Sequence, residues 1–452
     1  MSENETGSEK HFKLKVSHVL IILFLAGVGV FAYFRFSLKS KLQSRIDAIR
    51  AAGYPVTCAE LDKWYKIPPN VENAAYTILD AFSYYNLWDK EKADSLLFVG
   101  QAKLPARTEP MDEEMKALIA QHITDNNEAL KMLHAGAAIE HCRYPIDLNA
   151  GFDATIPNLS EILEGVYLLK LEAVLYAEKG DSKSAICSIK SCFGIARSLA
   201  TEPVTISQSV RSACQKLAVT TIEYCINRIK FTDEQLIELM DSVQNAERVS
   251  DISCALVGER CAGISFFRDP FSVNPDFIRG ISFRPILAFY NAIGMSDSDA
   301  IIYLDIMEGY INSTQLPYHK RLEAIWAIDA RIQKTSKAHV LLHAIIPRLT
   351  GITFLGTRNF AQLLTARVGL AIERCRLATG KLPDVLSELV PVYLDAVPTD
   401  PYDGKDLRYE KLGVGFVVYS IGEDLRDDGG SEELQAINKR GESWDVTFIV
   451  ER

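Results

Sequence analysis

The sequence predicts an α+β protein with an N-terminal transmembrane helix, a large all-α domain and a small C-terminal α+β domain. Three observations predict this: an uncharged apolar run near the start, helical periodicity through most of the chain, and turn-separated strand patterns near the end. The 452 residues are 48% hydrophobic and 24% charged, which excludes a disordered chain. The formal net charge of −10 argues against a nucleic-acid partner, because such binding needs clustered positive charge.

The first element is the apolar run from Val16 to Phe34, which contains no charged residue. At about 1.5 Å per residue it extends for roughly 28 Å, close to the hydrocarbon thickness of a bilayer. Lys15 and Arg35 flank it and suit the headgroup boundaries. We predict a short tail over residues 1–15 and a retained, single-pass anchor over residues 16–36. A cleaved signal peptide is disfavoured because the run is long and no small-x-small cleavage site follows it.

The orientation of this anchor is weakly encoded. Three lysines precede the span and five basic residues follow it, so the positive-inside count slightly favours a cytoplasmic body. The nine cysteines are odd in number and contain no Cys-x-x-Cys pair, so they do not identify the compartment.

The second element is an all-α domain, predicted over residues 37–350 from apolar spacing with helical period. The amphipathic segment Ser37–Arg50 is expected to end at Gly53, and Thr232 with Gln235 forms a capping box. Further helices are expected over Asn70–Ala81, Met111–Ala135, Asn158–Lys179, Ser182–Leu199, Ser207–Ile229 and Thr232–Ala246.

One stretch of this domain, Leu168–Ala200, resembles a tetratricopeptide repeat, with two helices joined at Gly180. A continuous solenoid core needs at least three stacked copies, and the sequence carries one. An irregular all-α domain is therefore favoured over a regular solenoid.

Familiar catalytic motifs are missing from the sequence, including the phosphate loop, the dinucleotide fingerprint, the His-Glu-x-x-His zinc motif and the nucleophile elbow. His339 and His343 would share a helix face, but no third ligand lies near them in the sequence. We interpret them, and likewise His134 and His141 beside Cys142, as packed or surface histidines. No catalytic or cofactor-binding residue is assigned.

The last element begins with a long helix over Asn359–Ala378 that ends at Gly380. A short helix is expected over Asp384–Leu394, followed by the turn-rich segment Val397–Gly404. Three strands are expected over Leu407–Glu410, Phe416–Ile421 and Trp444–Val450.

This order of elements resembles the C-terminal globular domain of the major pseudopilins of type II secretion. The residues that match the family's Gly-x-x-Pro, Pro-x-Asp-Pro, Ser-x-Gly-x-Asp, Gly-Gly and Asp-Val motifs are Gly380, Pro383, Pro398, Asp400, Pro401, Tyr402, Tyr409, Ser420, Gly422, Asp424, Gly429, Gly430, Asp445 and Val446. They span about a fifth of the chain. The sequence departs from the family because it lacks the pseudopilin leader and places the module far from the anchor. Leu425 also replaces the usual glycine after Asp424.

Acidic residues crowd the loop that follows the second strand: Asp424, Asp427, Asp428 and Glu432. Oxygen ligands at this density suit Ca²⁺, but Arg426 and Gln435 break an EF-hand register that starts at Asp424. The resemblance implies a Ca²⁺ site formed by Asp424 and Asp445, with Asp427 or Asp428 as an extra acid. The alternative is a solvated acidic turn without an ion.

Together these observations predict a membrane-anchored structural or interaction protein of the cell envelope, with residues 351–452 as a calcium-binding, pseudopilin-like domain. The resemblance places the protein in the inner membrane, with its body outside the cytoplasm, protein partners and a link to secretion. Two alternatives stay open. One is a helical-repeat binding scaffold with no role in secretion, and the other is an enzyme of unfamiliar type whose pocket lies in the α domain.

Overall fold

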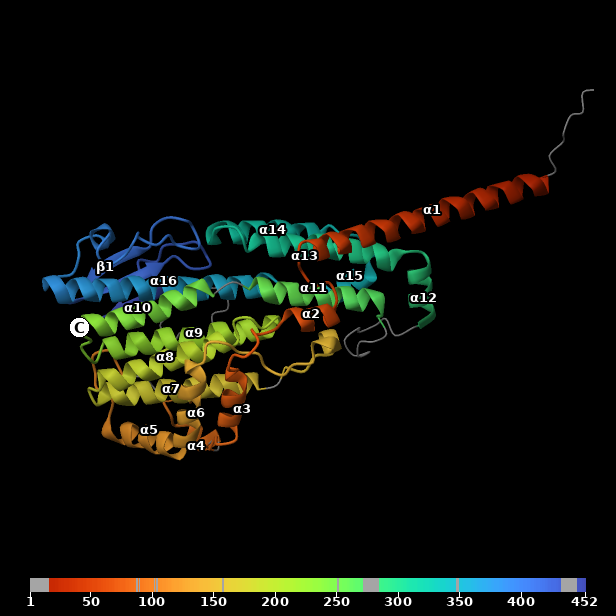
Figure 1. Ribbon diagram of the computed structural model, residues 1–452. Coiled ribbons are helices and arrows are strands. Elements are labelled where there is room, and N and C mark those ends of the chain that lie inside the picture. The colour runs from red at the N-terminus through yellow and green to blue at the C-terminus, as the bar shows by residue number, and fades with distance from the viewer. Residues whose placement is uncertain are drawn as a thin grey trace, which may run out of the picture.

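The computed structural model describes residues 16–86, 88, 90–100, 102, 105–156, 158–249, 252–270, 284–346, 349–431 and 445–452. Most of these residues are helical, and a small antiparallel sheet lies near the C-terminus, as the predicted α+β class requires (Figure 1). The helices between the first and the last are α2 (Cys58–Trp64), α3 (Ala74–Phe82), α4 (Lys90–Asp94), α5 (Glu113–Asp125), α6 (Asn127–Ala138), α7 (Leu159–Glu178), α8 (Ser182–Ser198), α9 (Thr205–Ile226), α10 (Asp233–Arg248), α11 (Ser253–Arg268), α12 (Arg284–Ala292), α13 (Met295–Ser313), α14 (Tyr318–Gln333) and α15 (Val340–Ile345).

The first helix, α1 (Val16–Ala51), is one continuous helix of 36 residues, so the predicted anchor and the amphipathic segment after it are joined without a break. Its apolar first half is exposed and projects from the body, with a mean hydropathy of 2.3 that is sufficient for a membrane span (Figure 1). Its second half packs on α13, where Ile46 is buried and Arg35 forms an ion pair with Asp297 at 2.8 Å. The expected stop is confirmed, because Gly53 adopts a left-handed φ of 84°.

A second stretch, Val340–Thr379, meets the same length and hydropathy criteria for a membrane span. Helix α16 (Thr350–Thr379) makes up most of it and packs against α9, α10 and the sheet. Many of its side chains are buried in the protein core, which is typical of a core helix.

The helical hairpin predicted at Gly180 is confirmed: α7 and α8 pack side by side, and Gly180 has a φ of 74°. The capping box at Thr232 and Gln235 is also present at the start of α10. The single helix predicted over Met111–Ala135 is wrong, because α5 and α6 meet at Asn126.

Asn126 interrupts that helix through its side chain, which is fully buried. Its amide oxygen accepts a hydrogen bond from Asn86 N at 2.8 Å, and its amide nitrogen donates to His122 O at 2.9 Å. An asparagine that bonds to nearby backbone groups competes with helix continuation, and here it holds the loop before α4 against the junction.

The C-terminal region follows its predicted order with one correction. Helix α16 ends at Thr379, and Gly380 has a left-handed φ of 73°, as expected. The predicted helix Asp384–Leu394 is reduced to a single 3₁₀ turn, Leu386–Leu389. Pro391 explains the early stop, because proline has no N–H to donate and disfavours helical backbone in the residue before it.

The three predicted strands are present as β1 (Arg408–Leu412), β2 (Gly415–Ser420) and β3 (Val446–Val450), in the order β1-β2-β3. All pairs are antiparallel, and Val418 of β2 lies opposite Tyr409 on one side and Phe448 on the other. The predicted strand position Trp444 lies outside the described residues.

The sheet shares its core with the helical body. One buried cluster contains Leu169 and Ile189 of the helical hairpin together with Phe416 and Phe448 of the sheet. Asn227, at the end of α9, adds a polar link, because its side chain donates to Ile449 O at 2.9 Å and accepts from Glu451 N at 2.8 Å. The C-terminal region is therefore packed onto the α domain through α9 and α16.

Gly369 allows β3 to approach α16 closely. A Cβ at this position would lie 2.3 Å from Phe448 Cδ1, within a core where Phe448 is fully buried. We expect Gly369→Ala to lower the free energy of unfolding by about 2 kcal/mol through overpacking. Gly356→Ala is the matched control, because it lies on the same helix and its Cβ would have open space. That variant gains helix propensity, by up to about 1 kcal/mol. Equal unfolding midpoints for both variants in denaturant would contradict this packing.

Candidate functional site

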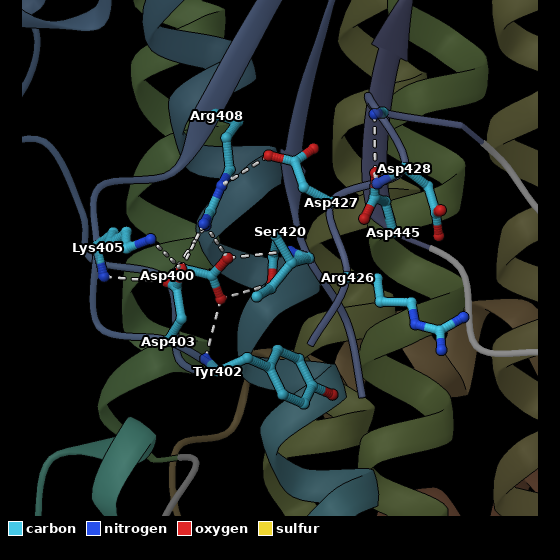
Figure 2. Close-up of polar contacts among 12 residues, drawn as sticks. Asp400, Tyr402, Asp403, Lys405, Arg408, Ser420, Arg426, Asp427, Asp428 and Asp445 are labelled. Carbon is cyan, nitrogen blue, oxygen red and sulfur yellow. Dashed lines mark hydrogen bonds and ion pairs between the residues drawn. The ribbon is translucent and has the colours of Figure 1, made fainter. Parts of the chain in front are cut away.

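Asp400 organises the turn that joins the helical part of the C-terminal region to its sheet. The carboxylate is fully buried and accepts hydrogen bonds from Tyr402 N at 2.9 Å, Ser420 Oγ at 2.7 Å and Ile421 N at 3.0 Å (Figure 2). The Pro-x-Asp-Pro turn and the Ser-x-Gly motif, which are separate in the sequence, therefore meet at this side chain. Its role is to fix the end of β2, where the acidic loop begins.

Arg408, in β1, is a cation that contacts both the turn and the acidic loop. Its guanidinium donates to Asp400 and Asp403, and its Nε lies 3.7 Å from Asp427 Oδ2 (Figure 2). Sequence reasoning assigned no role to this residue. The available signal was its place on a strand that directly follows two aspartates in a tight turn.

Asp445, immediately before β3, lies beneath the acidic loop. Its Oδ2 accepts hydrogen bonds from Asp428 N at 3.1 Å and Gly430 N at 2.8 Å (Figure 2). Only 5% of the residue is exposed, and among the described residues its buried Oδ1 has no hydrogen-bond partner. A buried carboxylate oxygen without a partner is unfavourable and calls for a proton or a cation.

The electrostatics of Asp445 agree with this geometry. Burial raises the pKa of its carboxyl to about 6, although the hydrogen bond that Gly430 donates lowers this pKa. The negative charges of Asp427 and Asp428 raise the pKa further. Three of the four predicted site residues, Asp427, Asp428 and Asp445, therefore interact with one another at the start of β3.

The fourth predicted residue, Asp424, is used differently. Its Oδ1 accepts a hydrogen bond from Arg426 N at 3.1 Å, so it forms a local turn at the exposed tip of the loop. Leu425 has a φ of 59°, the left-handed conformation for which glycine is favoured and which the pseudopilin glycine would adopt without strain. The contacts of the described residues do not join Asp424 to Asp445, and Glu432 lies outside them.

Acidic side chains and loop carbonyls are the donors that a hard cation such as Ca²⁺ prefers. Within the described residues Asp445 Oδ1 has no partner, and Asp427 and Asp428 supply neighbouring charge, so these groups would suit such an ion. Across the part of the chain that the structure describes, no three His, Cys, Asp or Glu side chains are grouped tightly enough to enclose a metal. Any further ligands at this position would be carbonyl oxygens and water.

These features define the chain as a helical protein with an exposed, apolar N-terminal helix and a small sheet module edged by an acidic loop. No protein-family model, curated protein or solved structure matches the chain.

Proposed function

We propose that this protein is a single-pass, membrane-anchored interaction protein of the cell envelope, whose pseudopilin-like C-terminal module binds Ca²⁺ at the acidic loop. The observation that carries the calcium part is the buried Oδ1 of Asp445, which has no partner within the described part of the chain. Asp445 and Asp428 would hold the ion, with Asp427 as a neighbouring charge. The bound ion would supply positive charge that offsets the repulsion among these carboxylates.

Calcium binding at this position would connect two segments of the module. Asp445 leads directly into β3, whereas Asp427 and Asp428 belong to the loop that leaves β2. Since β3 also contacts α9 through Asn227, an ion at Asp445 would stabilise the attachment of the module to the helical body. The bound ion would therefore have a structural role. Such a role suits a module that presents a surface to protein partners.

The anchor part of the proposal is supported by the continuity of α1. Its second half is packed on α13, where Arg45 forms an ion pair with Asp305 at 2.8 Å, and the apolar half extends from this packed end. A helix whose exposed apolar half continues into a half packed on α13 would stay attached to the body. The resemblance to pseudopilins supports an orientation with the body outside the cytoplasm, next to secretion components.

The topology is tested with protease applied to spheroplasts that express the full chain. We expect the added protease to cleave the body, because residues 37–452 would face away from the cytoplasm. Alkaline extraction of sonicated membranes is the fractionation control. It should leave the chain in the membrane pellet. Protection of the body in intact spheroplasts would contradict the orientation, and release of the uncleaved chain by alkali would contradict the anchor.

A further inference from the structure

The helical body contains a polar network that neither the anchor nor the acidic loop uses. His134 of α6 lies between Ser191 of α8 and Glu172 of α7. Its Nδ1 is 2.7 Å from Ser191 Oγ, and its Nε2 is 2.8 Å from Glu172 Oε2. The same Glu172 oxygen accepts a second hydrogen bond from Ser188 Oγ at 2.6 Å.

The protons in this network can be assigned from donor chemistry. An ionised carboxylate only accepts hydrogen bonds, so His134 donates to Glu172 through Nε2–H. The other ring nitrogen, Nδ1, is then an acceptor and receives the hydroxyl proton of Ser191. The order of groups is a hydroxyl, an imidazole base and a carboxylate that orients the base, which is the arrangement that activates a serine nucleophile. The imidazole faces its serine through Nδ1, and either nitrogen can accept a proton when the other donates to a carboxylate.

The activated hydroxyl lies at a cavity. Ser191 and His134 both line a space of about 830 Å³ among α6, α8 and α10, while Glu172 is buried behind the histidine. Ser188 is 1% exposed and bonds to the carboxylate, whereas Ser191 is 7% exposed and lines the cavity. A cavity of this size accommodates a small molecule.

The charge of the cavity lining indicates the kind of molecule that it would bind. The charged residues of the lining are Lys183, Lys190, Arg197, Arg248, Glu140 and Glu238. Cations outnumber carboxylates there, although the whole chain has a formal net charge of −10. A positive cavity in an acidic protein favours an anionic ligand. Ile186 and Phe193 add apolar surface beside these charges.

We propose that Ser191, His134 and Glu172 form a hydrolase site that cleaves an anionic carboxylic ester in this cavity. Ser191 Oγ bonds to the carbonyl carbon and transfers its proton to His134 Nδ1. The ester C–O bond breaks, and the leaving alcohol takes that proton. Water then attacks the acyl-enzyme, with His134 accepting its proton and returning it to Ser191 Oγ, so that one ester and one water yield one acid and one alcohol.

The other residues of the site have supporting roles in this reaction. Glu172 orients His134, and its carboxylate stabilises the imidazolium that forms twice in the cycle. The excess of cations in the lining favours the negative charge that develops on the carbonyl oxygen.

The test uses the full chain in detergent micelles and a fluorophosphonate probe, with the modified residue identified by peptide mass spectrometry. We expect the adduct on Ser191 of the native protein and none after heat unfolding. His134→Gln should slow labelling by about 100-fold or more, as loss of a general base does. Ser209→Ala should retain labelling, because this serine lies on α9 outside the cavity lining and its hydroxyl donates to Thr205 O.

Labelling of the native protein does not depend on how any variant folds. A native protein without an adduct on Ser191 would overturn the proposal, as would a His134→Gln protein that is labelled at the native rate. The substrate class is tested with mono-p-nitrophenyl glutarate against neutral p-nitrophenyl butyrate. Faster turnover of the anionic ester, abolished by Ser191→Ala, supports the proposal, whereas equal or faster turnover of the neutral ester contradicts the anionic preference.

Discussion

Replacing Asp400 with alanine is expected to lower the free energy of unfolding by about 3–5 kcal/mol, the usual cost of removing one partner of a buried ion pair. The carboxylate is fully buried and forms an ion pair with Arg408. Its loss leaves that guanidinium with Asp403 as its remaining close partner. It also removes the acceptor for Ser420 Oγ and for the backbone N–H groups of Tyr402 and Ile421.

The measurement is denaturant unfolding of the full chain in detergent. Asp395→Ala is the matched control, because this carboxylate belongs to the same region and is exposed. We expect the control to change stability by less than about 0.5 kcal/mol. Similar unfolding midpoints for the two variants would show that Asp400 does not hold the turn to the sheet.

Calcium is expected to stabilise the folded chain by about 2.7 kcal/mol when its free concentration is 100 times Kd, because an ion that binds only the folded state shifts unfolding by mass action. Thermal melting of the full chain with calcium and with chelator measures this gain. Asp445→Asn should remove most of it, since Asp445 supplies the buried oxygen that has no partner among the described residues. Glu410→Gln is the control, because Glu410 is exposed on β1 outside the loop and should leave the gain intact.

The Asp424→Asn variant distinguishes two hypotheses about whether Asp424 is a calcium ligand. The resemblance to pseudopilins makes Asp424 a ligand, and its neutralisation would then remove the calcium gain as well. The geometry places its carboxylate in a local turn with Arg426, which predicts a smaller loss. A calcium gain that survives Asp445→Asn and disappears in Asp424→Asn would move the site to the tip of the loop.

The calcium gain should also depend on pH. The folded pKa of Asp445, about 6, lies above the ordinary aspartate pKa of about 3.9, so the folded state binds the proton more tightly than the unfolded chain. Without calcium, this contribution to stability is complete below about pH 4 and is lost as the pH rises through 6. Calcium competes with that proton, so its affinity should increase between about pH 5 and 7. A calcium affinity that is the same at both pH values would contradict a role for the Asp445 carboxylate.

Local signals in the sequence predicted most of the elements. Gly180 and Gly380 end helices because they adopt the left-handed conformation, and Thr232 caps α10 with its own hydroxyl. Each of these effects depends on residues within a few positions of one another. The apolar run of α1 and the alternating pattern of the strands are equally local.

The features that sequence reasoning missed depend on contacts between distant residues. Asn126 ends α5 by bonding to Asn86, and Arg408 neutralises aspartates of a turn and a loop. His134 was interpreted as an ordinary packed histidine, whereas its ring bonds to two residues on two other helices. Periodicity assigns a residue to a helix face but does not show which side chains from other helices lie against it.

The calcium site is tested most directly by the stoichiometry of calcium binding to the full chain. Isothermal titration calorimetry at pH 7 in detergent measures it. We expect one Ca²⁺ per chain in the native protein, and loss of that binding in Asp445→Asn with the unfolding midpoint of the calcium-free variant preserved or raised. Absence of calcium binding to the native protein, or equal binding by Asp445→Asn, would contradict a calcium site at the buried carboxylate beneath the acidic loop.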